Sequence, residues 1–437
     1  MLLLYILLAY ALLVAPLLLA RLVLAPKEPF WILAPPGVCI RERFYSTLFR
    51  GSMPLKSRLF ITWRNCFYIA SLPFWTALWT LDDLLAPAYR ETELKAPVFL
   101  VGGFRTGTTS LHRSLAMDEK HYVSPRFAEL ALPFLSAQWV FDYLEALDKR
   151  NGTEYIAKIE KSLQSALGEE VMVRHPMAWY AAEEDDVVMA AWNWSGYYAL
   201  MHCPTTEWKM TAGQYSKMAP AEVDRAVTFY TRVIQKVVYR RGNGREYLSK
   251  SHLIELMPAL HRKIPGSRFV GIQRHPKDAI PSWFALGQAV TKAMSLSAQP
   301  KEAALDMHLQ YADKYYAAEA AFFANCANSL PSGPVLRGAD RRKFKLRFQE
   351  FLEQREASLL AIYQAFDMDF ERSDIPKALK DEAVQKAHQD YKKKFSYKNP
   401  ALDDLGLSLA DVEERYREYM QSANLASLSE PSQNGGR

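Results

Sequence analysis

The chain has 437 residues, of which 49% are hydrophobic and 13% aromatic, so it can bury a substantial core as one large or two ordinary domains. Its 54 basic and 48 acidic residues give a net charge of +6, too small and too dispersed to indicate nucleic-acid binding. The four cysteines show no short paired spacing, which argues against a zinc site or a disulfide framework.

The N-terminus is strongly apolar. Leu2 to Ala20 runs 19 residues without a charge, and as a helix it would extend about 28 Å, close to the thickness of a bilayer core. A secretory signal peptide would begin with basic residues and end in a small-residue cleavage site, and neither is clear here. We therefore expect a transmembrane anchor within residues 1–24, with a membrane-proximal region over residues 25–95.

A second uncharged stretch, Cys66 to Leu81, is 16 residues long and contains Pro73 and several aromatic residues. It is short for a membrane span, and its rings favour a helix lying in the headgroup region. A buried core helix is an equally good interpretation. Basic residues predominate between the two stretches, which is typical of cytoplasmic loops. The body of the protein is then cytoplasmic if the second stretch does not span, and external or lumenal if it does.

From Lys95 onward, strand-like and helix-like segments alternate. Strands are predicted at residues 97–101, 247–250 and 268–273, each followed by a helix. This order predicts an α/β fold over residues 96–421, a P-loop-type parallel sheet flanked by helices with its site at the carboxyl ends of the strands. The other predicted segments are a largely helical insertion at about 123–245, helices at 301–327 and 350–366, a strand at 343–348, and a disordered tail at 422–437.

A glycine loop, Gly102-Gly-Phe-Arg-Thr-Gly-Thr-Thr109, follows the first predicted strand. Such loops turn backbone N–H groups and a helix N-terminus toward an anion. Thr108 stands where an ATPase loop has its lysine, and the cation is Arg105 instead, so the loop lacks the side chain that contacts the β- and γ-phosphates of Mg-ATP. A basic residue followed by hydroxyls suits a phosphosulfate, which needs no metal. An ordinary strand-to-helix turn is the alternative.

The loop resembles the 5′-phosphosulfate loop of the sulfotransferase superfamily, in the branch that carries Arg and includes tyrosylprotein sulfotransferases. Arg268 to Ser282 resembles the family's 3′-phosphate-binding strand and helix, and Lys394 to Pro400 resembles its late segment that closes over the nucleotide. The resemblance implies the donor 3′-phosphoadenosine 5′-phosphosulfate, used without a metal. The residues implied to bind it are Arg105, Thr106, Gly107, Thr108, Thr109, Arg274, Ser282, Tyr397 and Lys398.

Sulfuryl transfer requires a base for the acceptor hydroxyl and cations for the charge on the leaving oxygen. Lys250, at the end of a predicted strand, resembles the family's lysine at the leaving phosphate oxygen. Glu129 follows the loop helix at a distance similar to that of the family's catalytic glutamate, although the spacing from Arg105 is a few residues longer. The competing bases are Glu183 and Glu184 in an acidic run, His112 on the loop helix, and His252 beside Lys250.

These features together predict a membrane-attached sulfotransferase with a hydroxyl acceptor. The apolar N-terminus favours a lipid or membrane-accessible alcohol, ahead of a carbohydrate or a protein tyrosine. Two other functions stay open: a P-loop phosphotransferase or NTPase, which the missing lysine opposes, and a non-catalytic membrane scaffold that retains the fold.

Overall fold

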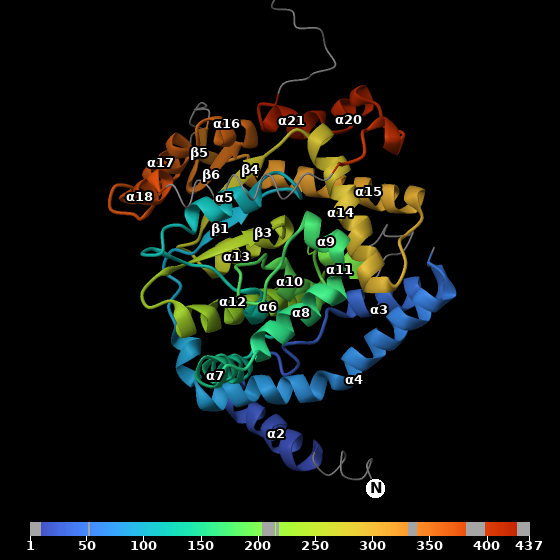
Figure 1. Cartoon of the computed structure of the whole chain (residues 1–437), viewed down its shortest axis with the longest axis vertical. Coiled ribbons are helices and arrows are strands. Elements are labelled where there is room, and N and C mark those ends of the chain that lie inside the picture. Colours follow the sequence, from blue (N-terminus) through green and yellow to red (C-terminus); the bar gives the residue numbers. More distant parts are fainter. Residues whose placement is uncertain are drawn as a thin grey trace, which may run out of the picture.

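The protein contains a single six-stranded parallel sheet, seen in a computed structural model that describes residues 10–50, 53–202, 215, 218–330, 339–381 and 398–425 (Figure 1). The strand order is β2-β3-β1-β4-β6-β5. The strands are β1 (Val98–Val101), β2 (Tyr122–Val123), β3 (Glu246–Ser251), β4 (Arg268–Gln273), β5 (Cys326–Leu330) and β6 (Asp340–Arg347). The predicted fold class, a parallel sheet flanked by helices, is confirmed.

The central strand, β1, explains how the sheet forms and where its site lies. Its four apolar residues alternate between the two faces, so Phe99 and Val101 enter one hydrophobic core and Val98 and Leu100 the other. β1 pairs with β3 on one side and β4 on the other, and Val101 is opposite both Ser251 and Gly271. The carboxyl ends of three strands therefore meet where the glycine loop begins.

Helices cover both faces of the sheet. The core that contains Phe99 is completed mainly by α12 (Pro220–Arg241), α13 (Met257–Lys263), α14 (Pro276–Ser295) and α15 (Lys301–Phe323). The core that contains Leu100 is completed by α5 (Thr108–Leu115), α16 (Phe348–Glu353) and α17 (Arg355–Ala365). The C-terminal elements are α18 (Ile375–Lys380), η7 (Asp403–Leu405), α20 (Leu409–Arg415) and α21 (Arg417–Ser422).

The insertion between β2 and β3 is largely helical, as predicted. Ahead of α12 it contains α6 (Phe127–Ala131), α7 (Leu135–Asn151), α8 (Tyr155–Leu167), α9 (Glu169–Arg174), α10 (Asp186–Val188), η4 (Met189–Asn193) and α11 (Tyr197–His202). The strands predicted at 97–101, 247–250, 268–273 and 343–348 correspond to β1, β3, β4 and β6. Strands β2 and β5 were not predicted, and residues 326 and 327, expected to be helical, begin β5. β2 has two residues and β5 is a partly polar edge strand, so neither carries a strong apolar pattern.

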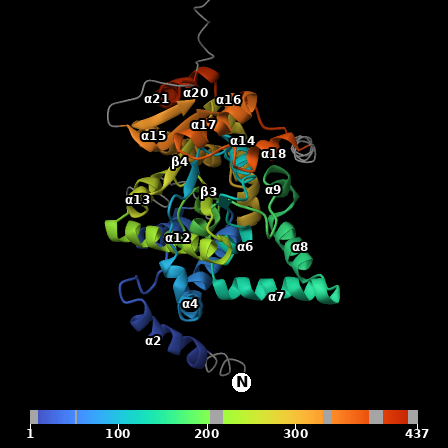
Figure 2. The same ribbon diagram turned by 90° about the vertical axis from the view of Figure 1, so that its left-hand side faces the viewer.

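The N-terminal region folds onto this domain as an arm. It contains η1 (Tyr10–Val14), α2 (Ala15–Leu24), α3 (Gly37–Tyr45), η2 (Ser46–Arg50), α4 (Leu55–Leu85) and η3 (Pro87–Glu91). Buried charges hold it: the Arg21 guanidinium lies 3.2 Å from the Asp83 carboxylate, and Lys236 of α12 lies 2.9 Å from Asp82. Figure 2 shows α2 and α4 at one end of the molecule, with α20 and α21 at the other.

The two predicted membrane segments have different outcomes. Within the described residues, no helix combines the length and the apolar character needed to cross a bilayer. Residues 1–9 of the expected anchor lie outside those residues, and Tyr10 to Ala20 forms η1 and the first part of α2. The second stretch lies within α4, which extends 31 residues, packs its inner side on the domain and leaves Phe67 and Phe74 exposed on its outer side. Of the predicted tail, residues 426–437 lie outside the described residues.

Candidate active site

The glycine loop links β1 to α5 in a conformation that depends on its glycines. Gly107 has φ of 102°, and a Cβ there would lie 2.2 Å from the Phe348 ring. A Cβ on Gly102 would lie 2.8 Å from the Ile272 carbonyl oxygen. The Thr106 hydroxyl donates to the Gly103 carbonyl at 2.7 Å, and α5 begins at Thr108. The loop thus has the tight turn and helix start that an anion cradle needs.

The two motifs implied to bind the donor meet in space. Arg105, itself at φ of 66°, donates from Nε to the Ser282 hydroxyl at 2.9 Å. Arg274, directly after β4, donates to the Arg105 carbonyl at 3.0 Å, and its guanidinium lies over the Phe348 ring. Residues 177 positions apart in the chain therefore share one surface at the carboxyl edge of the sheet. Two arginines and a hydroxyl in the first two turns of a helix are groups that can bind a phosphate-type anion.

Lys250, near the end of β3, lies beside this loop in a buried group of charges. Its Nζ donates to the Thr109 hydroxyl at 3.3 Å and lies 2.9 Å from Glu184 and 3.6 Å from Glu183. Burial alone would lower the pKa of Lys250, but Glu184 and Glu183 raise it above its usual value. Lys250 is therefore a cation at neutral pH, next to the glycine loop.

The acidic run reaches Lys250 through backbone hydrogen bonds. The Asp185 N–H donates to the Lys250 carbonyl at 2.9 Å, and the Glu183 N–H donates to Pro125 at 3.1 Å. Both glutamates are buried, which would raise their pKa. His175 and Lys250 nevertheless hold the pKa of Glu183 below its usual range, and Lys250 and His252 do the same for Glu184. Both carboxylates are thus ionised at neutral pH.

His252 completes the group. Its Nδ1 lies 3.4 Å from the Asp186 carboxylate and 3.7 Å from Glu184. The ring stacks on Phe104 of the glycine loop, with centroids 3.9 Å apart and planes 10° apart. Phe104 also stacks on Trp283 of α14 at 5.0 Å. The imidazole is therefore held between carboxylates on one side and the phosphate loop on the other.

The structure places Glu129 in a different environment from the one we expected. Its carboxylate accepts from Arg240 at 2.9 Å and from Arg241 at 2.7 and 2.8 Å, and it also caps the backbone N–H of Arg126. Burial would raise its pKa, but Arg241 and Arg240 keep the pKa of Glu129 lowered. Its hydrogen-bond and ion-pair partners share no residue with those of Lys250. Spacing along the sequence could not reveal this, because both arginines lie more than 100 residues away on α12.

The other predicted site residues are His112, Tyr397 and Lys398. His112 is buried on α5, and burial together with nearby Lys250 lowers its pKa to about 3. Tyr397 lies outside the described residues, and Lys398 is exposed. The residue after Lys398, Asn399, accepts from Arg174 at 3.2 Å, and the Arg174 carbonyl accepts from Arg105 at 3.3 Å. Of the late segment, Asn399 is thus linked to Arg105 through Arg174.

Two residues that contact the site were not identified from the sequence. Phe104 lies within the loop motif, but its stacking on His252 depends on the packing of two strands. His175 lies 3.1 Å from Glu183, eight residues further along the chain. No local pattern marks either contact.

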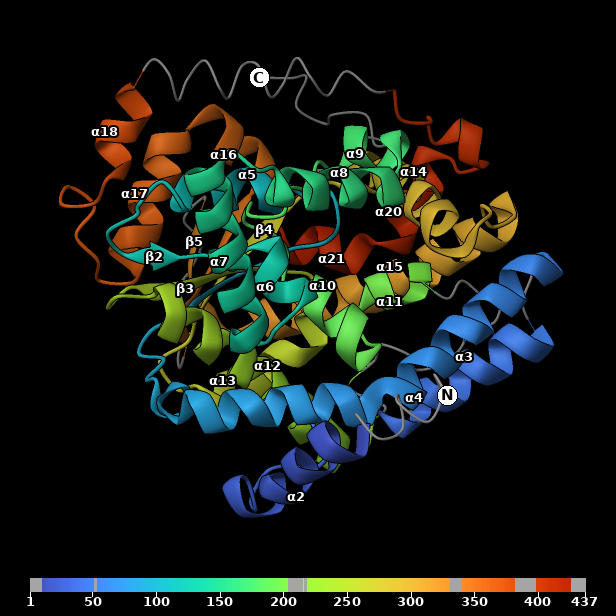
Figure 3. The same cartoon turned by 60° about the horizontal axis from the view of Figure 1, so that its bottom comes forward.

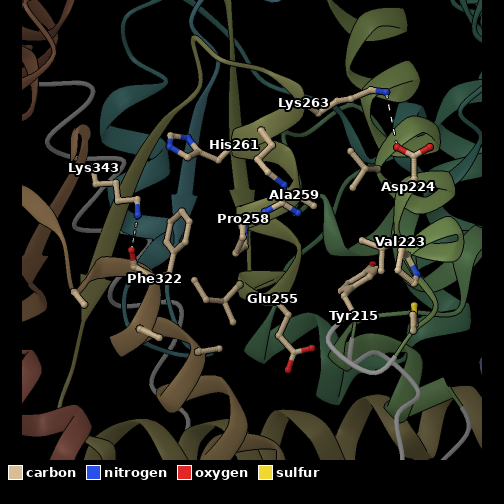
Figure 4. Close-up of a pocket in the computed structure, with 18 of the residues that line it drawn as sticks. Tyr215, Val223, Asp224, Glu255, Pro258, Ala259, His261, Lys263, Phe322 and Lys343 are labelled. Atoms are coloured by element: carbon tan, nitrogen blue, oxygen red, sulfur yellow. Dashed lines mark hydrogen bonds and ion pairs between the residues drawn. The ribbon is translucent and has the colours of Figure 1, made fainter. Parts of the chain in front are cut away.

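A large groove lies away from this site (Figure 4). It measures about 1030 Å³ and runs between α12, α13 and α15, from Glu255 to Lys263 and Lys343. Apolar groups such as Phe322 and Pro258 line much of it. It contains no residue of the phosphate loop and none of the charged group around Lys250, so it does not define the candidate active site.

Comparison with known proteins identifies the class. The sulfotransferase family model matches residues 97–372, and the chain belongs to that family. Among curated proteins it resembles omega-hydroxy-beta-dihydromenaquinone-9 sulfotransferase Stf3 of Mycobacterium bovis and of Mycobacterium tuberculosis. Each is 25% identical over 286 residues, which cover 63% of this chain and 64% of the relative. The match therefore spans slightly less than two thirds of those relatives.

Two solved structures share the fold. Sulfotransferase STF9 from Mycobacterium avium has a TM-score of 0.63 at 14% identity, covering 94% of this chain and 97% of its own. Sulfotransferase STF1 from Mycobacterium tuberculosis H37Rv has a TM-score of 0.53 at 16% identity, with coverages of 86% and 91%. Both alignments extend over most of each chain.

Proposed function

We propose that this protein transfers a sulfuryl group from 3′-phosphoadenosine 5′-phosphosulfate to the hydroxyl group of a lipid. The observation that carries the proposal is the contact between Arg105 and Ser282, with Arg274 bonded to the Arg105 carbonyl. These contacts bring the glycine loop next to Arg274 and Ser282. A donor that carries a 5′-phosphosulfate and a 3′-phosphate needs two such neighbouring groups of residues. Family membership supports the same class of reaction.

The residues of the loop fit such a donor. Gly102 and Gly107 leave the room that a Cβ would fill, and the start of α5 supplies backbone N–H groups. We propose that Arg105, with Thr106, Gly107, Thr108 and Thr109, holds the 5′ end and that Arg274 and Ser282 hold the 3′-phosphate. Lys398 and Tyr397 are proposed to close over the nucleotide. The donor supplies the sulfuryl group, whose bond to the 5′-phosphate oxygen breaks as the acceptor attacks.

Lys250 is proposed to stabilise the oxygen that leaves. Its contact with Thr109 puts the ammonium group beside the loop that holds the 5′ end. A cation preorganised by Glu184 and Glu183 in a buried site needs little reorganisation when negative charge develops there. The two glutamates also keep Lys250 charged, as their effect on its pKa requires.

We propose His252 as the base. Glu129 is occupied by two arginines, and the pKa values of Glu183 and Glu184 are lowered, so these carboxylates are poor proton acceptors. The Nδ1 of His252 faces Asp186, which can orient the ring and stabilise the imidazolium. Its Nε2 then takes the proton of the acceptor hydroxyl.

The acceptor is proposed to be a lipid alcohol, with a carbohydrate or a protein tyrosine as the alternatives. The Stf3 relatives are named for an omega-hydroxy menaquinone derivative. In this chain, Phe104, Tyr197 and Trp283 pack together next to His252, with Phe104 4.6 Å from Tyr197 and 5.0 Å from Trp283. These rings are 0–2% exposed and belong to the hydrophobic core, so the support for a lipid acceptor comes from the names of the relatives.

The test is transfer of labelled sulfate from the donor to a lipid extract by the full chain. His252→Ala is expected to lower kcat at least about 100-fold, because a general base is lost. Its affinity for adenosine 3′,5′-bisphosphate should stay within a few-fold of that of the wild type. His261→Ala is the matched control, since His261 pairs with Asp340 away from the site, and its kcat should be unchanged.

Three results would count against the proposal. Thermal stabilisation by Mg-ATP but not by the bisphosphate would indicate an NTPase. Label found only in sugars or proteins would reject the lipid acceptor. Full activity of His252→Ala would reject this base.

A further inference from the structure

Helix α4 exposes a continuous row of large apolar side chains. Leu55, Leu59, Trp63 and Phe67, the α4 row, recur every four residues and so lie along one side of the helix. Trp63 is 62% and Phe67 61% exposed, and their rings are stacked 6.0 Å apart. Single exposed apolar side chains are ordinary on soluble proteins, but a contiguous row of this size marks an interaction surface.

Neighbouring elements extend the row into a broader surface. Arg58 of α4 donates to the carbonyl groups of Thr47 and Leu48, which fixes η2 and its exposed Phe49 against the start of α4. α2 packs along α4 with Arg21 against Asp83, near the C-terminal end of α4, and exposes Leu22 and Val23 there. Figures 1 and 3 show α2 and α4 together at the same end of the molecule.

The exposed charges of the described part of residues 10–85 have one sign. They are those of Lys27, Arg41 and Lys56. The acids of the same region are withdrawn from solvent: Asp82 and Asp83 are buried in ion pairs with Lys236 and Arg21, and the others are Glu28 and Glu42, neither of them exposed. Exposed Glu91 and Glu93 follow the C-terminal end of α4, so the cationic character belongs to residues 10–85, and there it matches an anionic membrane surface.

We infer that the face formed by α2, η2 and the α4 row docks on an anionic lipid bilayer. Its rings lie at the depth of the headgroups, and Lys27, Arg41 and Lys56 contact lipid phosphates. Aromatic side chains prefer this boundary, and a helix with one apolar side lies in its plane. A second copy of the chain fits less well, because a two-fold interface would bring the same cations together.

The docked face is rigidly connected to the candidate active site. From α4, the Tyr68 hydroxyl donates to the Trp192 carbonyl at 2.6 Å, in the segment that follows the acidic run. Arg64 donates to the Met294 carbonyl of α14, the helix that carries Ser282. Docking would therefore hold the site in a fixed orientation to the bilayer. This consequence rests on the proposed function, whereas the binding itself does not.

Sedimentation of the full chain with vesicles tests the inference. Vesicles of phosphatidylcholine alone are compared with vesicles of equal parts phosphatidylcholine and phosphatidylglycerol, without donor or acceptor. We expect binding to the anionic vesicles. Trp63→Ser/Phe67→Ser should weaken it about 100-fold through lost apolar burial, and Lys27→Gln/Lys56→Gln about 20-fold. Leu352→Ser on α16 is the control, since Leu352 is 40% exposed at the far end of the molecule.

Either of two results would overturn the inference. The first is that the chain fails to bind anionic vesicles, and the second is that Trp63→Ser/Phe67→Ser binds them as well as Leu352→Ser does. A wild-type dimer in ultracentrifugation that this double variant dissociates, with vesicle binding unchanged, would show that the face is occupied by a second copy. The vesicle experiment measures no sulfate transfer, so a negative result does not bear on the proposed sulfotransferase activity. Likewise, a negative result in the transfer assay does not change the result with vesicles.

Discussion

Lys250 and the carboxylates around it show how burial sets the chemistry of single residues. Lys250 is 3% exposed and contacts Glu183 and Glu184, each also nearly fully buried. Each charge would be costly alone, and together they stay ionised because each offsets the desolvation of its partners. Glu129 is also buried and ion-paired, but its partners are Arg240 and Arg241 instead of Lys250.

Glu129→Gln is expected to affect stability and not turnover. The amide keeps the shape but loses the charge that Arg240 and Arg241 require, so the free energy of unfolding should fall by about 3 kcal/mol. Chemical denaturation measures that loss, and kcat should stay within a few-fold. Glu145→Gln is the control: Glu145 pairs with Lys149 at the surface, so a change below about 0.5 kcal/mol is expected. A large fall in kcat for a folded Glu129→Gln would restore Glu129 as the base.

Asp185 should make stability depend on pH. Burial raises its pKa to about 7 in spite of hydrogen bonds from tyrosines such as Tyr247. Since this value lies above that of the unfolded chain, the folded state binds the extra proton. The contribution of Asp185 to the free energy of unfolding is therefore complete below about pH 4 and is lost as pH rises to about 7.

The free energy of unfolding should accordingly fall between about pH 4 and 7, by up to about 4 kcal/mol from this group. Asp185→Asn should flatten the profile over that range, with its largest gain over the wild type at pH 8. Denaturation at fixed pH values gives the comparison. An unchanged slope in Asp185→Asn would show that another group titrates.

At the scale of elements, β1, the glycine loop and α5 are consecutive in the chain, so the shape of the loop depends on the backbone of a few neighbouring residues. Gly107→Ala combines a disfavoured φ of 102° with a Cβ 2.2 Å from Phe348. The loop must distort, so we expect affinity for adenosine 3′,5′-bisphosphate to fall at least about tenfold, together with a loss of stability of about 1–3 kcal/mol. Calorimetry measures the affinity. Gly152→Ala has the same type of backbone, φ of 67°, with no atom within 4 Å, and should leave the affinity unchanged.

The sequence could predict those parts of the site that are formed by contiguous segments of the chain. Strand, loop and helix around Arg105, and strand and helix around Arg274 and Ser282, are contiguous segments, so their pattern and spacing identified them. The acidic run joins Lys250 through pairing of distant backbones, an Arg126–Ala182 bridge and the Asp185–Lys250 hydrogen bond. Nothing local encodes those pairings. Glu129, whose distance from the loop helix resembles that of the family's glutamate, was therefore preferred over the pair that contacts Lys250.

At the scale of the whole molecule, the N-terminal arm is part of the folded body. The Arg21 guanidinium is buried against Asp83 and also donates to the carbonyl groups of Pro29 and Phe30. Glu28 of the arm accepts from Arg232 of α12 at 2.7 Å. An apolar N-terminal sequence read alone suggests a membrane segment, whereas these polar contacts appear only once α4 and α12 are in place.

Arg21→Ala should therefore destabilise the whole protein and not a detachable arm. Removing the guanidinium leaves Asp83 buried with only part of its ion pairing, because Arg90 remains 2.8 Å away, so we expect a loss of about 3 kcal/mol. Because the contacts of the arm belong to the same core as β1 and α12, unfolding should remain one transition at a lower Tm. Arg41→Ala, whose side chain is 69% exposed, should leave the Tm within a degree or so. Calorimetry showing two transitions in Arg21→Ala, with only the first displaced, would mean that the arm folds independently and could not hold the active site at a fixed orientation to a membrane.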